Sequence, residues 1–134
     1  MLVSMGTLLP EVVELAHGAN FAALTVHLGG GQAMTHLMWV DADEDCVLIN
    51  TEVHRDKFRV LQEDPRATVT IWAADNPYHY VEVRGQLVET IGGERARAHI
   101  DQLARKYLGR DYDPAAIQSE RVILRIAPES QHVH

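Results

Sequence analysis

The stretch VLINTEVHRDKFRVLQEDPRATVT, which runs from Val47 to Thr70, is the part of the chain around which the fold is predicted. Its first residues, Val47–Thr51, are mostly apolar and β-branched, which is typical of a strand. A segment with helix-like composition follows and ends at Asp64-Pro65, because a proline disfavours helical backbone in the residue before it. A second β-branched run, Ala67–Trp72, predicts another strand. The stretch therefore predicts a strand, a short helix and a second strand in succession.

The junction between the first strand and the helix gathers groups that bind anions. Thr51 brings a hydroxyl to the point where the helix begins, and Arg55, Lys57 and Arg59 lie in its first turns. The N-terminus of a helix also presents unpaired backbone N–H groups and the positive end of the helix dipole. Arginine binds phosphate through two N–H groups and lysine as a point charge. This pattern is suited to a phosphate or another anionic tail.

A second interpretation of the same cations is structural. Arg55, Lys57 and Arg59 are equally typical of the solvated face of a surface helix whose other face packs Phe58 and Leu61 against the core. Composition by itself favours this simpler interpretation, because Lys and Arg side chains are mostly exposed. The spacing of the residues does not separate the two.

Composition limits the size, the partners and the compartment. The chain has 134 residues, which favours a single domain over residues 1–134, and its formal net charge is −7. An acidic protein repels nucleic acid and anionic membranes, so any anion site has to be local. The only cysteine, Cys46, cannot form an internal disulfide, which fits a reducing cytoplasm. Residues 1–16 contain two glutamates and no basic leader, so we expect neither export nor a membrane span.

Turn residues and alternation predict the other elements. Pro10 suits the first turn of a helix and Gly18 its end. Gly85 interrupts a strongly alternating run, which predicts a β-bulge or a tight bend. A longer helix is expected over Glu94–Leu108, with Lys106 among its solvated residues. The further strands that we expect are Phe21–Leu28, Gln32–Val40, Tyr78–Val88 and Glu120–Ala127, with an acidic turn at Asp41–Asp45, a loop at Asp111–Ser119 and a polar tail after Ala127.

Roughly six strands, mostly in neighbouring antiparallel order, predict a mainly β fold: a small antiparallel barrel with peripheral helices. A parallel nucleotide-binding sheet does not fit, because no GxGxxG or GxxxxGK[ST] motif occurs and Gly29-Gly30-Gly31 lies between two strands. A metal site is not expected either. The histidines do not have HExxH spacing, and His132 and His134 lie at the end of the chain.

Two motifs together resemble a known family. The first is NTEVHRDKFRVLQEDPRATVT, residues 50–70, and the second is NPYHYVEVRG, residues 76–85. They resemble the split β-barrel flavin and deazaflavin oxidoreductases related to pyridoxamine 5′-phosphate oxidase, and most closely the mainly actinobacterial branch that uses the deazaflavin coenzyme F420. The resemblance covers residues 8–127. His54 stands where the family often has glycine, and Val60 where it often has asparagine.

This resemblance implies a six-stranded, FMN-binding-like split β-barrel that forms a homodimer with two cofactor sites at the subunit interface. The residues that match the family's phosphate clamp are Thr51, Arg55 and Lys57. The cofactor ring would lie along Thr35, His36, Leu37 and Met38, and the partner subunit would contribute from Asn76, Tyr78 and Tyr80.

The activity that the resemblance implies is hydride transfer from reduced F420 to an unsaturated acceptor such as an enone, quinone or bilin. An FMN-dependent oxidoreductase is the alternative, and a non-catalytic carrier of a flavin or haem-type ligand is a third possibility. The arginine motif that grips the pyridoxal substrate in true pyridoxamine phosphate oxidases is missing near the C-terminus. No catalytic residue is assigned, although His36, His79 and Tyr80 are candidate proton donors, and Trp39 and Trp72 could wall the ring. An oligoglutamate tail on F420 would need further cations, for which Arg59, Arg84 and Arg125 are candidates.

Overall fold

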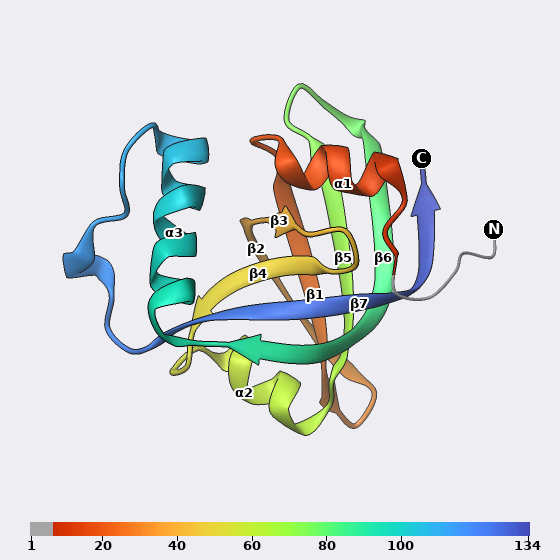
Figure 1. Ribbon diagram of the computed structural model, residues 1–134. Coiled ribbons are helices and arrows are strands. Elements are labelled where there is room, and N and C mark those ends of the chain that lie inside the picture. Colours follow the sequence, from red (N-terminus) through yellow and green to blue (C-terminus); the bar gives the residue numbers. More distant parts are fainter. Residues whose placement is uncertain (1–6) are drawn as a thin grey trace.

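The computed structural model describes residues 7–134, which form one curled, seven-stranded antiparallel sheet with three α-helices around it (Figure 1). The strands lie in the order β2-β1-β5-β6-β7-β4-β3. The predicted mainly β, antiparallel fold with peripheral helices is therefore confirmed, and the sheet has the form of a curled half-barrel. The strands are β1 Phe21–Gly29, β2 Gln32–Trp39, β3 Asp41–Ala42, β4 Val47–Glu52, β5 Arg66–Ala73, β6 Asn76–Ile91 and β7 Arg121–Val133; the helices are α1 Pro10–His17, α2 Asp56–Glu63 and α3 Gly93–Leu108, with one 3-10 turn at Pro114–Ala116.

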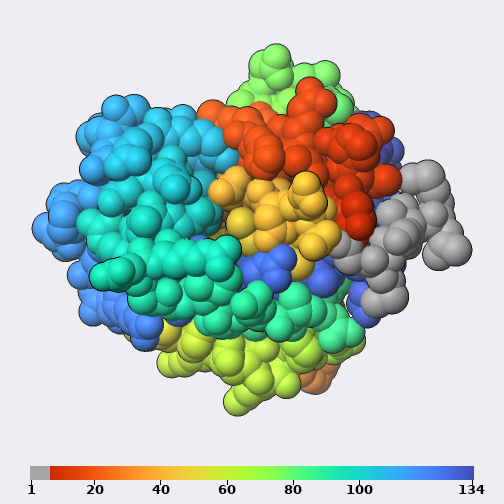
Figure 2. Space-filling model, viewed as in Figure 1, coloured from red at the N-terminus to blue at the C-terminus, as the bar shows by residue number. Residues whose placement is uncertain are grey.

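The prediction of six strands was one short, because the acidic turn after β2 contains the two-residue strand β3, which pairs with the start of β4. After β3 the chain turns at Asp43, whose Oδ1 accepts the backbone N–H groups of Asp45 at 2.9 Å and Cys46 at 2.7 Å. An aspartate that bonds backbone groups two residues ahead is a common way to close a turn. Figure 2 shows this segment at the surface between α1 and α3.

The predicted end of the last strand at Ala127 was also wrong. β7 continues to Val133, and its final residues pair with the first half of β6. Gln131 lies buried in this extension. Its side chain accepts the backbone N–H of Leu9 at 2.7 Å and donates to the carbonyl oxygen of Thr7 at 2.9 Å. The polar tail is thus part of the sheet, because the segment before α1 satisfies its buried amide.

The bulge predicted at Gly85 is confirmed. The register between β6 and β7 shifts between Arg84 and Gly85. At this point the two backbones approach so closely that a Cβ atom on Gly85 would lie 1.8 Å from the carbonyl oxygen of Ala127. A residue without a side chain is therefore required where the long strands bend.

Two side chains of α3 fasten this helix to the sheet. Lys106 was expected to be solvated, but it is half-buried, and its ammonium donates to the carbonyl oxygens of Ala16 at 2.9 Å and Val40 at 2.6 Å. The hydroxyl of Tyr107 accepts the backbone N–H of Val40 at 3.1 Å and donates to the carbonyl oxygen of Asn20. Burial raises the pKa of Tyr107 to about 12. These contacts hold α3 beside the end of β2.

No helix within residues 7–134 is long and apolar enough to cross a membrane. Residues 1–6 belong to the predicted domain and to the segment in which no leader was expected, and they lie outside the residues that the structure describes.

Candidate functional site

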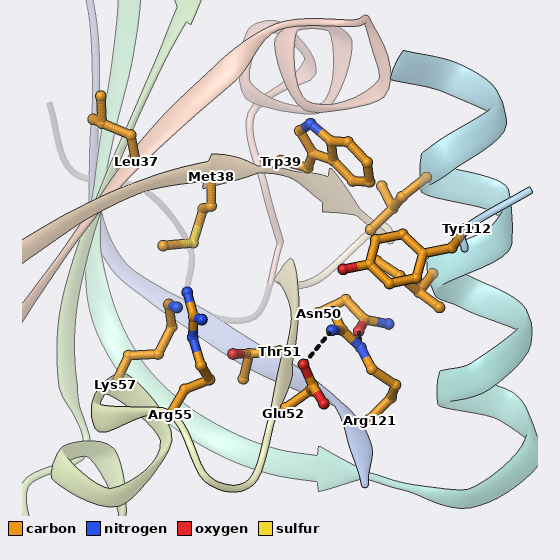
Figure 3. A pocket seen from close by; sticks show the side chains of 12 residues that line it. Leu37, Met38, Trp39, Asn50, Thr51, Glu52, Arg55, Lys57, Tyr112 and Arg121 are labelled. Atoms are coloured by element: carbon orange, nitrogen blue, oxygen red, sulfur yellow. Dashed lines mark hydrogen bonds and ion pairs between the residues drawn. The ribbon is translucent and has the colours of Figure 1, made fainter. Parts of the chain in front are cut away.

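A groove with a volume of about 290 Å³ lies between the end of β2, the end of β4, the start of α2, and α3 (Figure 3). One end is cationic and the other is formed by aromatic, aliphatic and paired polar side chains. The lining residues are Leu37, Met38, Trp39, Asn50, Thr51, Glu52, Arg55, Lys57, Ile100, Leu103, Tyr112 and Arg121.

The cationic end joins the three residues predicted to clamp a phosphate. Thr51 is the penultimate residue of β4, Arg55 precedes the first turn of α2, and Lys57 lies in that turn. Within residues 7–134, neither Arg55 nor Lys57 forms an ion pair. Arg59 fits the interpretation of a solvated face, since it is exposed and pairs with Asp56. Arg55 is exposed too but lines the groove, and only Lys57 is buried. The structure thus brings together a hydroxyl and two uncompensated cations.

Lys57 has the environment of an anion ligand rather than of a surface lysine. Its side chain is buried, with a relative exposure of 6%. Burial, followed by the positive charges of Arg55 and Arg121, lowers the pKa of Lys57 to about 8. A buried ammonium beside other cations is costly unless a negative charge compensates it. A bound phosphate would supply that charge.

Of the four residues predicted to line the cofactor ring, two line the groove. Leu37 and Met38 line the groove, and Leu37 is 71% exposed at its rim. His36 lies close enough to the cations that, after burial, the charges of Lys57 and Arg55 lower its pKa. Thr35 is not part of the groove, and its hydroxyl lies 2.8 Å from that of Thr25 on β1.

The opposite end of the groove contains an ion pair that the sequence interpretation missed. Arg121, at the start of β7, donates through Nε to Oδ1 of Asn50 at 2.9 Å, and its Nη1 lies 3.3 Å from Oε2 of Glu52. Oε1 of Glu52 accepts the backbone N–H groups of Gln118 at 2.6 Å and Ser119 at 2.7 Å. Burial acts to raise the pKa of Glu52, but these N–H groups and Arg121 hold it below its ordinary value. Glu52 therefore remains ionised beside Arg121.

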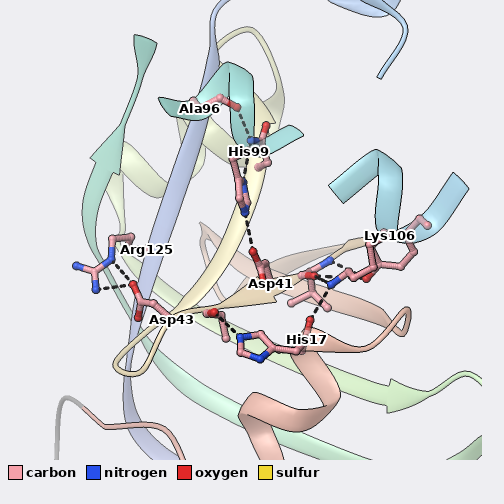
Figure 4. Close-up of polar contacts among 12 residues, drawn as sticks. His17, Asp41, Asp43, Ala96, His99, Lys106 and Arg125 are labelled. Carbon is pink, nitrogen blue, oxygen red and sulfur yellow. Dashed lines mark hydrogen bonds and ion pairs between the residues drawn. The ribbon is translucent and has the colours of Figure 1, made fainter. Parts of the chain in front are cut away.

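A chain of hydrogen bonds extends from Asn50 away from the groove (Figure 4). Nδ2 of Asn50 donates to the carbonyl oxygen of Ala96 at 3.0 Å and lies 3.1 Å from Nδ1 of His99. Nε2 of His99 in turn lies 2.9 Å from Oδ2 of Asp41. With the Asn50 amide donating, Nδ1 of His99 accepts and Nε2–H donates to Asp41. The chain fixes the orientation of the amide that holds Arg121.

The residues predicted to come from the partner subunit do not reach the groove of their own chain. Asn76, Tyr78 and Tyr80 lie at the start of β6, next to the C-terminus (Figure 1). Tyr78 is 85% exposed, and the ring of Tyr80 stacks on His134 at a centroid distance of 4.3 Å. Their contribution across a subunit interface stays a prediction.

The other candidates of the sequence analysis have structural partners. Arg84 pairs with Glu82 at 2.8 Å, and Arg125 pairs with both Asp43 and Glu89 at 2.8 Å. With Arg59 paired to Asp56, none of the three arginines considered for an oligoglutamate tail is uncompensated. Of the two tryptophans, Trp39 lines the groove and Trp72 does not. Residues 7–134 contain no cluster of three side chains able to hold a metal ion.

Comparison with known proteins supports the fold. A family model described as pyridoxamine 5′-phosphate oxidase matches residues 8–134. An F420 reductase superposes with a TM-score of 0.79 at 23% identity, covering 93% of this chain and 98% of that one. A putative pyridoxamine 5′-phosphate oxidase from Listeria innocua gives 0.64 at 18% identity, with coverages of 89% and 90%. A conserved hypothetical protein from Mycobacterium tuberculosis gives 0.72 at 17% identity, with coverages of 96% and 86%. No curated protein matches the chain.

Proposed function

Because the chain belongs to the pyridoxamine 5′-phosphate oxidase family, whose fold is that of flavin-binding oxidoreductases, we propose that it is an F420-dependent reductase. It would transfer a hydride from the reduced deazaflavin to an unsaturated acceptor such as an enone, quinone or bilin. The observation that carries this proposal is the pair of uncompensated cations, Arg55 and Lys57, beside Thr51 in a groove. Such a set of groups fits the phosphate that F420 and FMN share.

The residues of the groove have distinct tasks in this proposal. Arg55 and Lys57 bind the phosphate, and Thr51 donates its hydroxyl to it. Leu37 and Met38 give an apolar edge against which the ring system lies. The bound cofactor supplies the hydride chemistry, while the protein supplies position and electrostatics. His36 faces the cations, and its lowered pKa keeps it neutral near pH 7, so it can act as a hydrogen-bond partner without adding charge.

The choice between F420 and FMN rests on two observations that point in opposite directions. The likeness in fold to an F420 reductase over nearly the whole of both chains favours F420. The ion pairs of Arg59, Arg84 and Arg125 favour FMN, because an oligoglutamate tail would have to compete with their carboxylate partners. FMN is therefore the second candidate cofactor. The third candidate function of the same site is that of a carrier, which binds a cofactor without turnover.

Binding measurements decide between the cofactors. We expect the purified protein to quench the fluorescence of F420 on binding, with a dissociation constant at least tenfold lower than that for FMN. Oxidation of the reduced cofactor by a panel of enones, quinones and bilins then tests catalysis. Binding of FMN in preference to F420 would support the FMN-dependent oxidoreductase. Binding of a cofactor without turnover of any acceptor would support the carrier. Failure to bind either cofactor would refute both oxidoreductase proposals and the flavin carrier.

A homodimer is part of this proposal, because a groove of about 290 Å³ is at the lower limit for a small-molecule site and cannot enclose a tricyclic ring with its tail. The outer face of the sheet offers a surface for a second copy. The cross-strand register aligns four aromatic residues in one row across β2, β1, β5 and β6, and Leu37 lies beside this row. The row consists of Trp39, Phe21, Trp72 and Tyr80. A twofold contact on this face would carry Tyr80 of one subunit toward Leu37 of the other.

Leu37→Asp is expected to weaken dimerisation at least tenfold, because it places a charge where a 71% exposed leucine would become buried. Analytical ultracentrifugation over a concentration series measures the effect. Val88→Asp is the control, since Val88 is an apolar residue that is 57% exposed and lies in the second half of β6, whereas Tyr80 lies in the first half. A wild-type protein that is monomeric at micromolar concentration, or equal dimer affinity for both variants, would remove this face from the proposal.

A further inference from the structure

We propose that the Arg121 end of the groove is a second subsite, which binds the neutral carbonyl oxygen of a conjugated acceptor and rejects anionic acceptors. The inference rests on the proposed reductase function and adds to it the residue that selects the acceptor. The three residues of the phosphate cradle do not belong to this end, which begins at β7 and is closed by α3 (Figure 3).

Arg121 is held rigidly and still has donors to offer. Its relative exposure is only 9%, and its guanidinium lies 5.3 Å from the centre of the Tyr112 ring. Nε binds Asn50, and Nη1 pairs with Glu52. A guanidinium carries five N–H groups, so these two contacts leave N–H groups for a ligand in the groove. Arg121 can therefore act as a fixed hydrogen-bond donor.

The support behind Arg121 comes from three further elements. Asn50 of β4 is oriented by His99 of α3, and His99 is oriented by Asp41 of β3 (Figure 4). Burial acts to raise the pKa of Asp41, but the hydrogen bond from His99 holds it below its ordinary value, so the chain ends on an ionised carboxylate. A donor fixed through such a supporting network loses little freedom when it binds a ligand.

The local charge favours a neutral oxygen at this end. Glu52 compensates the charge of Arg121 at 3.3 Å, whereas Arg55 and Lys57 have no carboxylate partner within the described residues. A carboxylate or sulfonate next to Arg121 would face the ionised Glu52, and like charges in a groove repel strongly. A carbonyl oxygen accepts the same N–H group without that repulsion. The groove thus has a phosphate end and a separate end for a neutral acceptor.

The walls of this end fit a flat, conjugated molecule. The rings of Trp39 and Tyr112 stand at 86° to each other with centroids 6.2 Å apart, and Ile100 and Leu103 of α3 complete the apolar surface. Aromatic and aliphatic walls with one fixed polar group are the usual design of a small-molecule site. Addition of a hydride to an enone (at the β-carbon) or to a quinone leaves negative charge on the carbonyl oxygen until a proton is taken up, at the α-carbon of the enone or at the oxygen of the quinone. Arg121 would stabilise that charge. A bilin, which carries anionic side chains, fits this end less well than an enone or quinone.

The test uses cofactor-free protein and two probes that differ by one charge, 1,4-naphthoquinone and 1,4-naphthoquinone-2-sulfonate. In a Trp72→Phe background, Trp39 is the only tryptophan, so quenching of its fluorescence reports binding in the groove. With inorganic phosphate at a saturating concentration, so that the cationic end of the groove is occupied, we expect the neutral quinone to bind at least tenfold more tightly than the sulfonate. The double variant Arg121→Met/Glu52→Gln removes both charges of the pair together. We expect it to bind the neutral quinone at least tenfold more weakly.

The control variant is Arg55→Met, which lies at the other end of the groove and should change quinone affinity less than twofold. Conversely, the Arg121/Glu52 variant should keep inorganic phosphate affinity within twofold. Equal quinone affinity in the parent and the Arg121/Glu52 variant, or preference for the sulfonate, would overturn the subsite. The two proposals fail separately. Quinone binding without binding of F420 or FMN refutes the reductase and keeps the subsite. Cofactor binding together with an equal quinone affinity in the Arg121→Met/Glu52→Gln variant keeps the reductase and refutes the subsite.

Discussion

The double variant Arg55→Met/Lys57→Met is expected to bind the phosphate-bearing cofactor at least a hundredfold more weakly than the wild type. Each charge-assisted hydrogen bond contributes about 1.5 to 3 kcal/mol, so the loss of two amounts to about 3 kcal/mol or more. Methionine keeps the apolar stem of each side chain, so packing at the start of α2 is largely retained. Folding should even improve slightly, because a buried and uncompensated ammonium is removed. Fluorescence titration with F420 and FMN measures affinity, and thermal unfolding measures stability.

The matched control for this variant is Arg59→Met, because Arg59 is a cation of the same helix that is exposed and paired with Asp56. It should leave cofactor affinity within twofold of the wild type. If Arg59→Met weakens binding as strongly as the double variant, the effect comes from the general field of α2 rather than from a clamp. If the double variant binds like the wild type, the phosphate assignment is wrong.

The pH dependence adds a test of the lysine itself. The pKa of Lys57 is lowered to about 8, so the free protein carries the full charge below that pH and loses it as the pH rises. The charge of the cofactor's phosphate is constant above pH 7, because the monoester of FMN has its second pKa at about 6 and the diester of F420 has no second ionisation. Cofactor affinity should therefore fall between pH 8 and pH 10 in the wild type, with uptake of a proton on binding. Lys57→Arg keeps its charge over this range and should show no such fall.

The sequence was sufficient to predict the cationic end of the groove because its parts are neighbours in the chain. Thr51, Arg55 and Lys57 lie within seven residues, and the geometry of a strand followed by a helix brings them together. What composition could not decide was whether Lys57 is solvated or buried. That depends on parts of the chain that are distant in sequence, among them Arg121, whose positive charge acts on Lys57.

The other end of the groove could not be predicted in this way. Arg121 and Asn50 are 71 positions apart in the sequence, and Asn50 and His99 are 49 apart. Their contacts depend on β7 pairing with β4 and on α3 packing across both, which no local pattern specifies. One signal was present. Arg121 opens an alternating apolar run, where a charge at the strand start needs a partner.

The predicted end of the last strand was wrong for a similar reason. The tail after Ala127 is polar, so a pattern based on burial ends the strand there. In the fold, this segment lies against β6, and the buried amide of Gln131 is satisfied by backbone groups of Thr7 and Leu9, 124 and 122 positions away. A polar residue can be buried where distant backbone supplies its partners, and sequence alone does not show those partners.

Gly85 is the position where the predicted and observed folds agree most closely and where one added carbon should do the most damage. Its backbone does not require a left-handed conformation, so the constraint is space alone. The nearest atoms belong to the backbone of β7, at Ala127 and Pro128, and these cannot move aside as a flexible side chain could. Substitution must push apart the two longest strands at the bend that curls the sheet.

Gly85→Ala is therefore expected to destabilise the protein by about 3 kcal/mol or more, because a Cβ placed 1.8 Å from the Ala127 oxygen forces a backbone shift. For a chain of this size that corresponds to a fall in melting temperature of roughly 10 °C. Gly30→Ala separates this collision from backbone strain, because Gly30 has a φ of 60° and no atom within 4 Å of its added Cβ. It should cost only about 1 kcal/mol. Differential scanning calorimetry compares the two, and a Gly85→Ala protein that melts no lower than Gly30→Ala would show that β6 and β7 are not in contact at this bend.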